Sequence, residues 1–415
     1  MEKLAIFGGE KAKKTPYGTG NRFNGNELKY LEEALKQNTL FYWFGNMTRR
    51  FCDTFAKMYD SKYCVASSSG TSAIHVALGA VGVEPGDEVI TSPITDMGSV
   101  IGILYQNAIP VFADLDPYSF NMDPKSVKEK ITDRTKAIIV VHLAGNSAEI
   151  EEIVKIAKEK NIYVIEDCAQ AYCCKYNGKY VGTFGDIGCF SLNDFKHISA
   201  GDGGMLITDD QKLYERALMF ADKNFNRIGK GINKSVPFLA PNYRMNELTA
   251  AVGLAQLEIV EDLCAKRKVY GDGLTNALKN IQGITPMKVL DECESSYWFY
   301  LFRIDEKQLG VSRKEFVEAL NAEGLEAQEG YIPTCVYQYQ MFKNNTIYPG
   351  KTQCPVDGVY GRKMEYHDGD CPIAEEILAT SVRLSVNEFY TEQDLEETIC
   401  AIQKVCEYYR NKMTK

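Results

Sequence analysis

Short runs of branched apolar residues alternate with helical patterns between residues 63 and about 210, and this alternation limits the folds open to the chain. Four runs are rich in apolar side chains, mostly Val and Ile: residues 88–91, 110–114, 137–142 and 163–166. Residues 149–160 place Ile and Val on one stripe, which predicts a helix with one buried face. Such alternation is typical of a mostly parallel sheet covered by helices on both faces. The sequence therefore predicts an α/β domain.

Composition narrows the class of protein further. The chain has 415 residues, of which 45% are hydrophobic and 25% charged, enough for a large core and a smaller second domain. A formal net charge of −9 argues against a nucleic-acid surface. We expect a cytoplasmic protein with no membrane partner, because the N-terminus lacks a signal-peptide pattern and no apolar run reaches membrane-spanning length.

Cysteine and histidine usage predicts neither a disulfide framework nor a metal site. The 13 cysteines are scattered through a long chain, which favours buried thiols. Residues 367–371 contain His, Asp and Cys, but these ligand types all lie in one loop without a second group nearby. We therefore expect no bound metal.

One lysine lies between an apolar run and a glycine-rich turn. In the stretch of residues 190–204, Lys196 follows the apolar segment and precedes the Gly-Asp-Gly-Gly sequence of residues 201–204. A lysine at the end of a buried segment is poorly hydrated, which disfavours its ammonium form and leaves an amine that can attack an aldehyde. The segment alone fits a surface lysine in a strand–turn–strand equally well, so other motifs must decide.

A carboxylate ends the apolar run at residues 161–167. Ligands of α/β proteins bind at the carboxyl ends of parallel strands, where Asp167 is expected. A carboxylate there can pair with a protonated pyridine nitrogen and keep that ring electron-accepting. Asp167 could instead cap a following helix. Glu166 should point to the opposite face of the sheet.

Small hydroxyl residues link an apolar strand to a helical pattern at residues 64–78. Backbone N–H groups at a helix N-terminus, together with hydroxyls, can bind a phosphate. Ser and Thr also cap helices that bind nothing. With Asp167 and Lys196, this turn predicts a phosphate site.

These motifs occur in a fixed order, which ends in Asn-Tyr-Arg-Met-Asn-Glu at residues 242–247. With Ser-Gly-Thr at 69–71, Glu-Asp-Cys-Ala-Gln at 166–170 and Ser191-x4-Lys196, the chain resembles the DegT/DnrJ/EryC1/StrS family of aminotransferases. The resemblance extends from residue 7 to residue 375 and the terminal helix. It implies PLP fold type I, with pyridoxal 5'-phosphate (PLP) as cofactor.

The resemblance also assigns roles to residues. It implies that Lys196 forms the Schiff base with PLP, that Asp167 pairs with the pyridine nitrogen, and that Gln170 packs near the cofactor. The expected catalytic residues are thus Lys196 and Asp167. The expected cofactor-binding residues are Gly70, Thr71, Ser72, Asp96, Met97, Asp167, Gln170, Ser191, Lys196 and Asn242, of which Ser191, Gly70 and Thr71 would hold the phosphate.

One position departs from the pattern of many relatives. Where an aromatic side chain stacks on the pyridine ring in those relatives, this chain has Asp96. Either Met97 or a nearby tyrosine takes the place of that aromatic, or Asp96 marks a subgroup with a different polarity beside the cofactor. His142, at the end of residues 137–142, either approaches the same edge or is a structural histidine.

The chain is expected to divide into three parts. Residues 1–25 form an N-terminal arm, residues 26–281 a large PLP-binding domain, and residues 282–415 a smaller α+β C-terminal domain. Within the large domain, the resemblance makes residues 222–246 a segment that crosses to a partner subunit. The expected assembly is a homodimer with shared active sites, in which Asn242 reaches the neighbour's cofactor phosphate.

The activity implied is transfer of an amino group from an amino acid, glutamate or glutamine, to a keto sugar, nucleotide-linked in the expected case, or to a keto cyclitol. The expected kinetics are ping-pong. One alternative is a PLP-dependent deoxysugar dehydratase, in which histidine replaces the lysine; Lys196 weighs against it, although His197 is adjacent. Another is a regulatory or binding protein on the same fold. The acceptor and the position aminated are not specified by the sequence.

Overall fold

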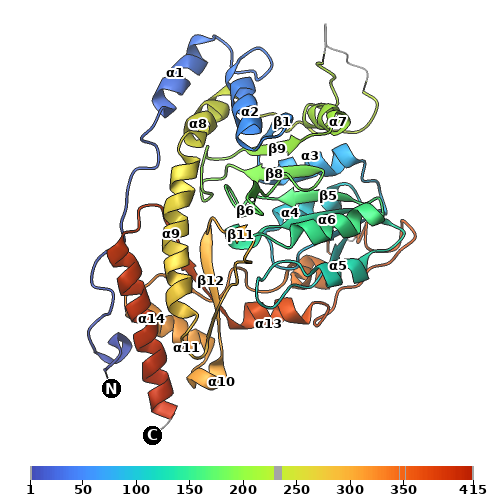
Figure 1. The fold of residues 1–415 in the computed structure, drawn as a ribbon. Helices are drawn as coiled ribbons and strands as arrows, with labels where there is room; N and C mark the ends of the chain where they lie inside the picture. Colours follow the sequence, from blue (N-terminus) through green and yellow to red (C-terminus); the bar gives the residue numbers. More distant parts are fainter. Residues whose placement is uncertain (1, 229–235, 345, 351, 414–415) are drawn as a thin grey trace.

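A seven-stranded, mostly parallel sheet forms the centre of the molecule (Figure 1). The computed structural model describes residues 2–228, 236–344, 346–350 and 352–413. In spatial order the strands are β1 (Tyr63–Ser67), β9 (Gly204–Thr208), β8 (Ile187–Ser191), β5 (Tyr163–Asp167), β4 (Thr135–Val141), β2 (Glu88–Thr91) and β3 (Ile109–Phe112). Strand β9 runs antiparallel to β1 and β8, and the other neighbouring pairs are parallel. The predicted α/β sheet is confirmed.

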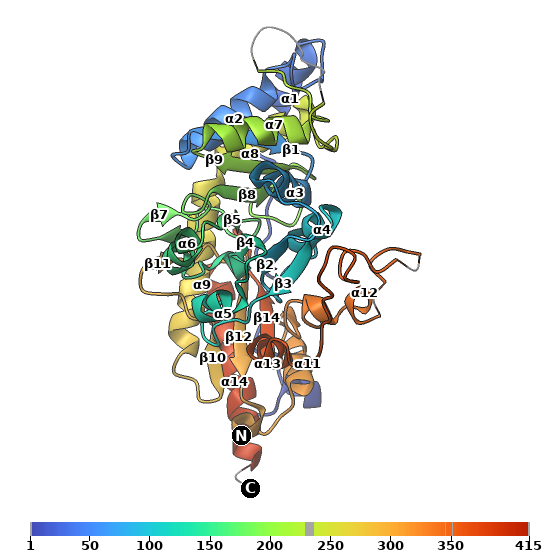
Figure 2. The ribbon, with the colours of Figure 1, turned by 90° about the vertical axis from the view of Figure 1, so that its right-hand side faces the viewer.

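Alternate residues of the strands enter the cores on the two faces. In β4, Ala137 and Ile139 belong to one hydrophobic cluster, whereas Ile138 and Val140 belong to another. This period of two is what a sheet buried on both faces requires. Helices α3 (Gly70–Val81) and α7 (Gln211–Ala221) contribute to the first cluster, α5 (Pro124–Lys130) and α6 (Ile150–Glu159) to the second, and α4 (Gly98–Tyr105) to both. Figure 2 shows the helices on either side of the sheet.

A helical layer made from distant parts of the sequence covers the end of the sheet near β1, β9 and β8. It consists of α1 (Glu27–Lys36), α2 (Met47–Met58), α8 (Glu247–Leu257) and the start of α9 (Val260–Leu278). Buried Glu247 accepts hydrogen bonds from the N–H groups of Met47 (2.7 Å) and Thr48 (3.1 Å) at the start of α2. A carboxylate at that N-terminus complements the helix dipole, so α8 fixes the position of α2.

A four-stranded antiparallel sheet lies at the far end of α9 (Figure 1). Its order is β10 (Ile284–Pro286), β12 (Phe299–Ile304), β14 (Ser381–Ser385) and β13 (Ala327–Gln328). The neighbouring helices are α10 (Glu306–Leu309), α11 (Arg313–Ala322), α12 (Gln340–Lys343), α13 (Pro372–Thr380) and α14 (Glu392–Met413). This α+β part agrees with the predicted pattern of strands and helices, while the boundary at residues 281 and 282 stays a prediction.

The first residues of the chain are bound to its C-terminal part. The short helix η1 (Ala5–Phe7) begins at Ala5, whose N–H donates to Glu323 of the loop after α11 at 2.8 Å. The Lys13 ammonium donates to Asp394 of α14 at 2.6 Å, and both side chains are buried. The N-terminal arm is therefore attached to the C-terminal part by these two contacts, with Glu323 and with Asp394. Among the helices that the structure describes, none is long and apolar enough to cross a membrane.

A small three-stranded sheet joins the two parts. Strand β11 (Cys293–Glu294) pairs with β6 (Lys175–Tyr176), which pairs with β7 (Lys179–Tyr180). The short 3-10 helices η2 (Leu143–Gly145) and η3 (Val336–Gln338) complete the elements. Backbone pairing thus links residues 175–176 of the large part with residues 293–294.

Candidate active site

A cavity of about 250 Å³ lies where β1, β5 and β8 end and α3 begins. Its lining comes from segments far apart in the sequence: Ser69, Gly70, Thr71, Ile74, Thr95, Asp96, Gly98, Ser99, Asp167, Ala169, Gln170, Ser191, Asn193, Lys196 and Asp202. Ligands of open α/β sheets bind at this carboxyl edge. The structure therefore brings seven of the ten predicted site residues to one cavity: Gly70, Thr71, Asp96, Asp167, Gln170, Ser191 and Lys196.

The N-terminus of α3 forms one wall of the cavity. Ser69 caps the helix, since its hydroxyl accepts from the N–H of Ser72 at 3.0 Å. Within the described residues, the N–H groups of Gly70 and Thr71 have no acceptor, so they remain available to an anion. A Cβ on Gly70 would come within 2.6 Å of the Ser191 Cβ, so only glycine lets α3 approach β8 this closely.

Lys196 is buried at the other side of the cavity. Its Nζ lies 3.8 Å from the centroid of the Trp298 ring. Burial lowers the pKa of Lys196 from 10.5 to about 8, although Asp167 and Asp96 oppose that change; Arg383 reinforces it. A large fraction of Lys196 is therefore an uncharged amine at slightly alkaline pH, as a nucleophile requires.

Asp167 is buried and held by a chain of hydroxyl groups. Ser99 donates to Asp167 Oδ2 at 2.6 Å, and the N–H of Ala169 donates to Oδ1 at 3.0 Å. Because the single Ser99 proton goes to Asp167, Thr95 supplies the proton of its 2.6 Å hydrogen bond with Ser99. Burial raises the pKa of Asp167 despite these hydrogen bonds and the Lys196 charge. No helix follows β5, since β6 is the next element, so the helix-cap alternative is wrong.

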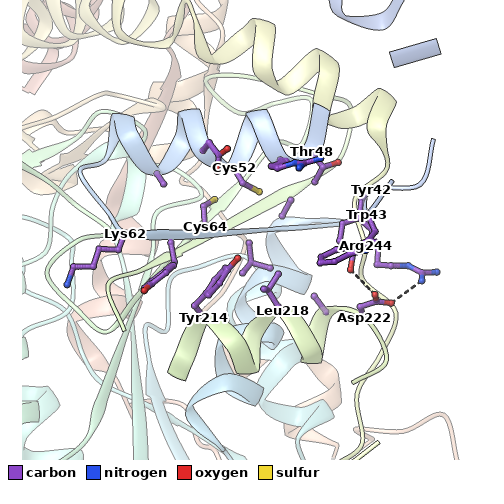
Figure 3. A pocket seen from close by; sticks show the side chains of 17 residues that line it. Tyr42, Trp43, Thr48, Cys52, Lys62, Cys64, Tyr214, Leu218, Asp222 and Arg244 are labelled. Atoms are coloured by element: carbon purple, nitrogen blue, oxygen red, sulfur yellow. Dashed lines mark hydrogen bonds and ion pairs between the residues drawn. The ribbon is translucent and has the colours of Figure 1, made fainter. Parts of the chain in front are cut away.

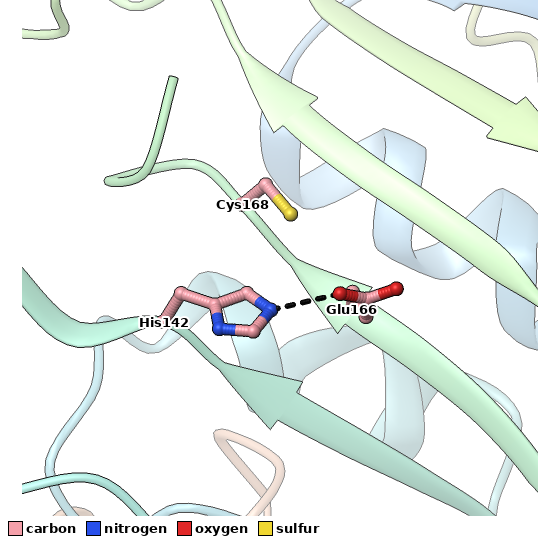
Figure 4. A group of neighbouring side chains, drawn as sticks. All are labelled: His142, Glu166 and Cys168. Atoms are coloured by element: carbon pink, nitrogen blue, oxygen red, sulfur yellow. Dashed lines mark hydrogen bonds and ion pairs between the residues drawn. The ribbon is translucent and has the colours of Figure 1, made fainter. Parts of the chain in front are cut away.

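The neighbouring residues Glu166 and His142 face away from this cavity. His142 Nε2 lies 3.0 Å from Glu166 Oε2 (Figure 4). The N–H groups of Gly182, Phe184 and Gly185 donate to the same carboxylate at 2.7 Å. Burial opposes the charge of Glu166, but these hydrogen bonds outweigh it and hold its pKa below the ordinary value. His142 is thus the structural histidine of the two alternatives.

Cys168 lies beside this pair, so the three side chains have the composition of a metal site. His142 Nδ1 accepts from the N–H of Ala148 at 3.2 Å, and the Glu166 oxygens are already shared among four donors. Both potential ligands are therefore committed to the protein, and the arrangement serves to fix the loop after β7.

Three predicted residues lie outside the cavity lining. The hydroxyl of Ser72 is part of the α3 cap, where it accepts from the Ser69 N–H at 2.8 Å. Met97 packs against the hydrophobic cluster to which α5 and α6 contribute. Asn242 is exposed and pairs with Asp222 through a backbone bridge. Of the predicted crossing segment 222–246, residues 229–235 lie outside the described part. The roles of Ser72, Met97 and Asn242 stay predictions.

Asp96, at the position where the resemblance led us to expect an aromatic ring, lies in the cavity lining. Its Oδ1 accepts from the N–H of Gly98 at 2.8 Å, at the start of α4. Its negative charge raises the pKa of Tyr331, although burial of that phenol is the larger cause. The cavity therefore has a fixed carboxylate at this position.

Aromatic residues of the C-terminal part were missed by the sequence analysis. Trp298 covers Lys196, and its indole N–H donates to the carbonyl oxygen of Phe195 at 2.6 Å. Gln170 donates to the Tyr331 hydroxyl at 3.2 Å while its amide oxygen accepts from the N–H of Ala144 at 2.9 Å. Gln170 is thus fully oriented by the protein. Trp298 and Tyr331 carry no local motif; only the fold brings them to the lysine.

A second cavity, of about 360 Å³, lies between α2, β1 and α7 and contains none of the predicted site residues (Figure 3). At one end Tyr42 and Arg244 both bind Asp222, at 2.7 and 3.0 Å. Lys62 lies at the other end, and between the two ends the thiols of Cys52 and Cys64 point toward one another. Its lining includes Lys62, Asp53 and Asp222 but neither Lys196 nor Asp167.

The residues of the first cavity fit PLP. They offer an amine at Lys196, a buried carboxylate at Asp167, and free N–H groups with a hydroxyl at Gly70, Thr71 and Ser191. An aldehyde, a pyridine nitrogen and a phosphate need these three kinds of partner. Fold and site together define a PLP-dependent aminotransferase of fold type I.

Residues 21–357 match the model of the DegT/DnrJ/EryC1/StrS aminotransferase family, and the chain belongs to that family. GDP-perosamine synthase of Escherichia coli O157:H7 is 39% identical over 277 residues, covering 66% of this chain and 74% of that protein. A protein of Streptoalloteichus tenebrarius, provisionally named L-glutamine:3-amino-2,3-dideoxy-scyllo-inosose aminotransferase, is 37% identical over 330 residues, covering 78% of this chain and 79% of that protein.

A solved structure extends the similarity to the whole fold. The crystal structure of an aminotransferase from Psychrobacter cryohalolentis superposes with a TM-score of 0.84 at 28% identity, covering 96% of this chain and all of that one. The chain is therefore similar to sugar and cyclitol aminotransferases over about two thirds or more of its length, and PLP is its cofactor.

Proposed function

We propose that this chain transfers an amino group from glutamate or glutamine to the ketone of a sugar or cyclitol. The observation that carries the proposal is the placement of Lys196, a buried amine with a lowered pKa, in one cavity with Asp167 and the N-terminus of α3. The two relatives have names that refer to a nucleotide-linked sugar and to an aminocyclitol. Both acceptor classes carry hydroxyl groups next to a ketone, so both stay within the proposal.

We assign the cofactor contacts as follows. Gly70, Thr71 and Ser191 hold the phosphate, Asp167 pairs with the ring nitrogen, and Gln170 packs beside the ring. When bound, PLP supplies an aldehyde that condenses with amines and a cationic ring that stabilises negative charge on the neighbouring carbon. Asp167 keeps that ring nitrogen protonated, and Ser99 with Thr95 keeps Asp167 oriented toward it.

Lys196 moves the proton in the proposed reaction. With PLP and the donor bound, the free Lys196 amine would take a proton from the substrate carbon and return it later in the same half-reaction. Its pKa of about 8 suits both directions of transfer near neutral pH. Donor and acceptor use the same site in turn, so the kinetics are ping-pong.

The dehydratase alternative is less well supported. That chemistry places a histidine where this chain has Lys196, and the adjacent His197 is fully buried, with its Nε2 3.0 Å from the carbonyl oxygen of Ser296. His197 is also absent from the cavity lining. A histidine held in this way has no route to a substrate carbon.

We further propose a homodimer with shared sites. Asn242 is exposed at the edge of residues 222–246, and its neighbours Asp222 and Arg244 are fixed by an ion pair of 3.0 Å. An exposed amide beside such a fixed ion pair suits contact with the cofactor phosphate of a second subunit. The two-fold symmetry of such a dimer makes both sites equivalent.

The function is tested with purified protein loaded with PLP. L-Glutamate and L-glutamine should convert the absorbance of bound PLP to that of its amino form. Keto sugars linked to nucleotides, or keto cyclitols, should then restore the original spectrum and yield an aminated product by mass spectrometry. Conversion by the amino acids without restoration by any compound of either acceptor class would reject the proposal.

A further inference from the structure

The loop between β2 and α4 places a carboxylate, Asp96, in the wall of the first cavity. Its Oδ1 accepts from the N–H of Gly98 at 2.8 Å, whereas its Oδ2 has no hydrogen-bond partner among the described residues. A Cβ on Gly98 would lie 2.7 Å from Thr71 Oγ1 and 3.1 Å from Asp96 Oδ1, so glycine is needed where this loop approaches α3. Asp96 is exposed, so the carboxylate is fixed through one oxygen and free to bind through the other.

The charge of Asp96 acts on ionisable groups from both parts of the molecule. Burial raises the pKa of Asp167 on β5, and of Tyr331 and Tyr339 in the C-terminal part, and the negative charge of Asp96 adds to each rise. Burial lowers the pKa of Lys196, and Asp96 opposes that change. Of these groups, Lys196 alone can carry a positive charge.

The other charged groups around Lys196 do not take the place of Asp96. Asp167 is committed to the ring nitrogen in the proposed function, and Arg383, a cation, disfavours a second positive charge nearby. Asp202 also lines the cavity, but its charge is not among those that shift the Lys196 pKa. Among the described carboxylates of the lining, Asp96 is therefore the one left to balance a positive charge at Lys196.

A carboxylate at this position changes what the cavity offers to the face of PLP. An aromatic ring, which we expected here from the resemblance, would bind that face by stacking. A carboxylate contributes no stacking, and it is unfavourable next to a bound ring unless a positive charge compensates it. The nitrogen through which Lys196 is proposed to hold PLP becomes such a charge when it is protonated.

We propose that Asp96 is the counter-ion of the nitrogen that joins Lys196 to PLP and keeps that nitrogen protonated; this inference rests on the attachment of PLP to Lys196 in the proposed function. A nearby anion favours the charged form of a titrating nitrogen. Protonation withdraws electrons from the adjoining carbon and makes it more reactive toward a donor amine. Asp96 thus extends this reactivity to alkaline pH, whereas Asp167 serves the ring nitrogen.

The inference is tested by a pH titration of the absorbance of protein loaded with PLP. Protonated and unprotonated forms of the lysine–PLP bond absorb at different wavelengths, so the titration measures the pKa of that nitrogen without turnover. In Asp96→Asn the amide oxygen can still accept from Gly98, but the charge is lost, and the pKa should fall by about one unit. Asp96→Phe supplies a stacking ring without the charge and should show a similar fall, whereas Asp96→Glu keeps the charge and should show a smaller one.

Asp202→Asn is the matched control. It removes a carboxylate from the lining of the same cavity and changes the net charge equally. The pKa of the lysine–PLP nitrogen in this variant should equal that of wild type. An equal fall in Asp202→Asn and Asp96→Asn would attribute the effect to the overall charge of the cavity and overturn the assignment to Asp96.

The cofactor-free protein provides a second readout, which also serves if a variant does not retain PLP. Carbamylation of Lys196 by cyanate, followed by peptide mass spectrometry, reports the fraction of uncharged amine at each pH. Because Asp96 opposes the lowering of the Lys196 pKa, the pH at half-maximal reaction should be lower in Asp96→Asn than in wild type. Melting temperatures check that each variant folds.

An unchanged pKa of the lysine–PLP nitrogen in Asp96→Asn would overturn the inference, whatever the result with the cofactor-free protein. If Asp96→Asn does not retain PLP, an unchanged cyanate profile has the same consequence. Failure of the proposed attachment is distinguishable, because Lys196→Ala would then keep the pH-dependent absorbance. Neither measurement uses an acceptor, so both are independent of the acceptor class.

Discussion

Arg22 donates a hydrogen bond from Nη2 to the carbonyl oxygen of Lys196, with an N–O distance of 2.5 Å. The same nitrogen donates to the carbonyl oxygen of His197 at 2.9 Å. Arg22 Nε also lies 3.5 Å from Glu388 Oε1, and the other oxygen of Glu388 binds Arg267. The N-terminal segment thus holds the backbone that carries the reacting lysine, and an ion-pair network ties it to the C-terminal part.

Replacing Arg22 by Gln should slow turnover without abolishing it. The guanidinium holds carbonyl groups of the lysine loop, so its loss leaves Lys196 present but less well positioned. We expect the rate of covalent PLP attachment and kcat each to fall about tenfold, with less change in KM. Arg134→Gln is a matched control, because Arg134 donates to the carbonyl oxygen of Tyr360 far from the cavity. Equal effects of the two variants would contradict a positioning role for Arg22.

Lys196 should destabilise the cofactor-free protein below pH 8. Its pKa is about 8 in the folded state and 10.5 in the unfolded chain, so below pH 8 the fold contains a buried charge. Between pH 8 and 10.5 the unfolded state binds the extra proton, and stability relative to a variant without this amine rises with pH. Lys196→Met should therefore be more stable at pH 7 by at most roughly 3 kcal/mol.

Urea denaturation of both cofactor-free proteins, at one protein concentration, measures this difference. The gap between variant and wild type should narrow from pH 8 to pH 10.5, whereas titration of all other groups cancels in the comparison. A gap that stays constant over this range would show that packing, not the lysine charge, causes it.

Much of the candidate site could be predicted because it lies at strand ends. Asp167 and Ser191 each end an apolar run, and parallel strands bring such ends to one edge of a sheet. Lys196 follows five residues after Ser191, which is close enough for the same edge. Local sequence therefore contained the position of these side chains, and periodicity alone identified the buried face of α6.

The other side of the site depends on how distant segments dock. Trp298 directly precedes β12 of the second sheet, and Arg22 belongs to the N-terminal arm, so more than a hundred residues separate each from Lys196. No periodic pattern reports such docking. The role of Ser99 could have been predicted from the sequence. Thr95 and Ser99 follow β2 at a spacing of four residues, and hydroxyl groups at that spacing near a strand end can contact a carboxylate.

Asp167→Asn should separate cofactor binding from turnover. The amide can still occupy the space and accept from Ser99, but it cannot stabilise a protonated ring nitrogen. We expect PLP to remain bound and the first half-reaction with L-glutamate to slow by at least about 100-fold. Ser99→Ala leaves the carboxylate in place and should cost only about tenfold. Near-normal turnover of Asp167→Asn would remove Asp167 from the mechanism.

Mixed dimers test whether Asn242 serves the neighbouring subunit's site. Lys196→Ala and Asn242→Asp, the second of which places a negative charge against phosphate, should each be nearly inactive as homodimers. After joint unfolding and refolding, a mixed dimer in a shared-site enzyme has one site with both lesions and one with neither. Random pairing makes about half the dimers mixed, so activity should recover to roughly a quarter of wild type. If Asn242 acts within its own subunit, every site keeps one lesion and mixing restores nothing. Different affinity tags on the two chains show whether mixed dimers have formed, so absence of recovery in purified mixed dimers would exclude the shared site.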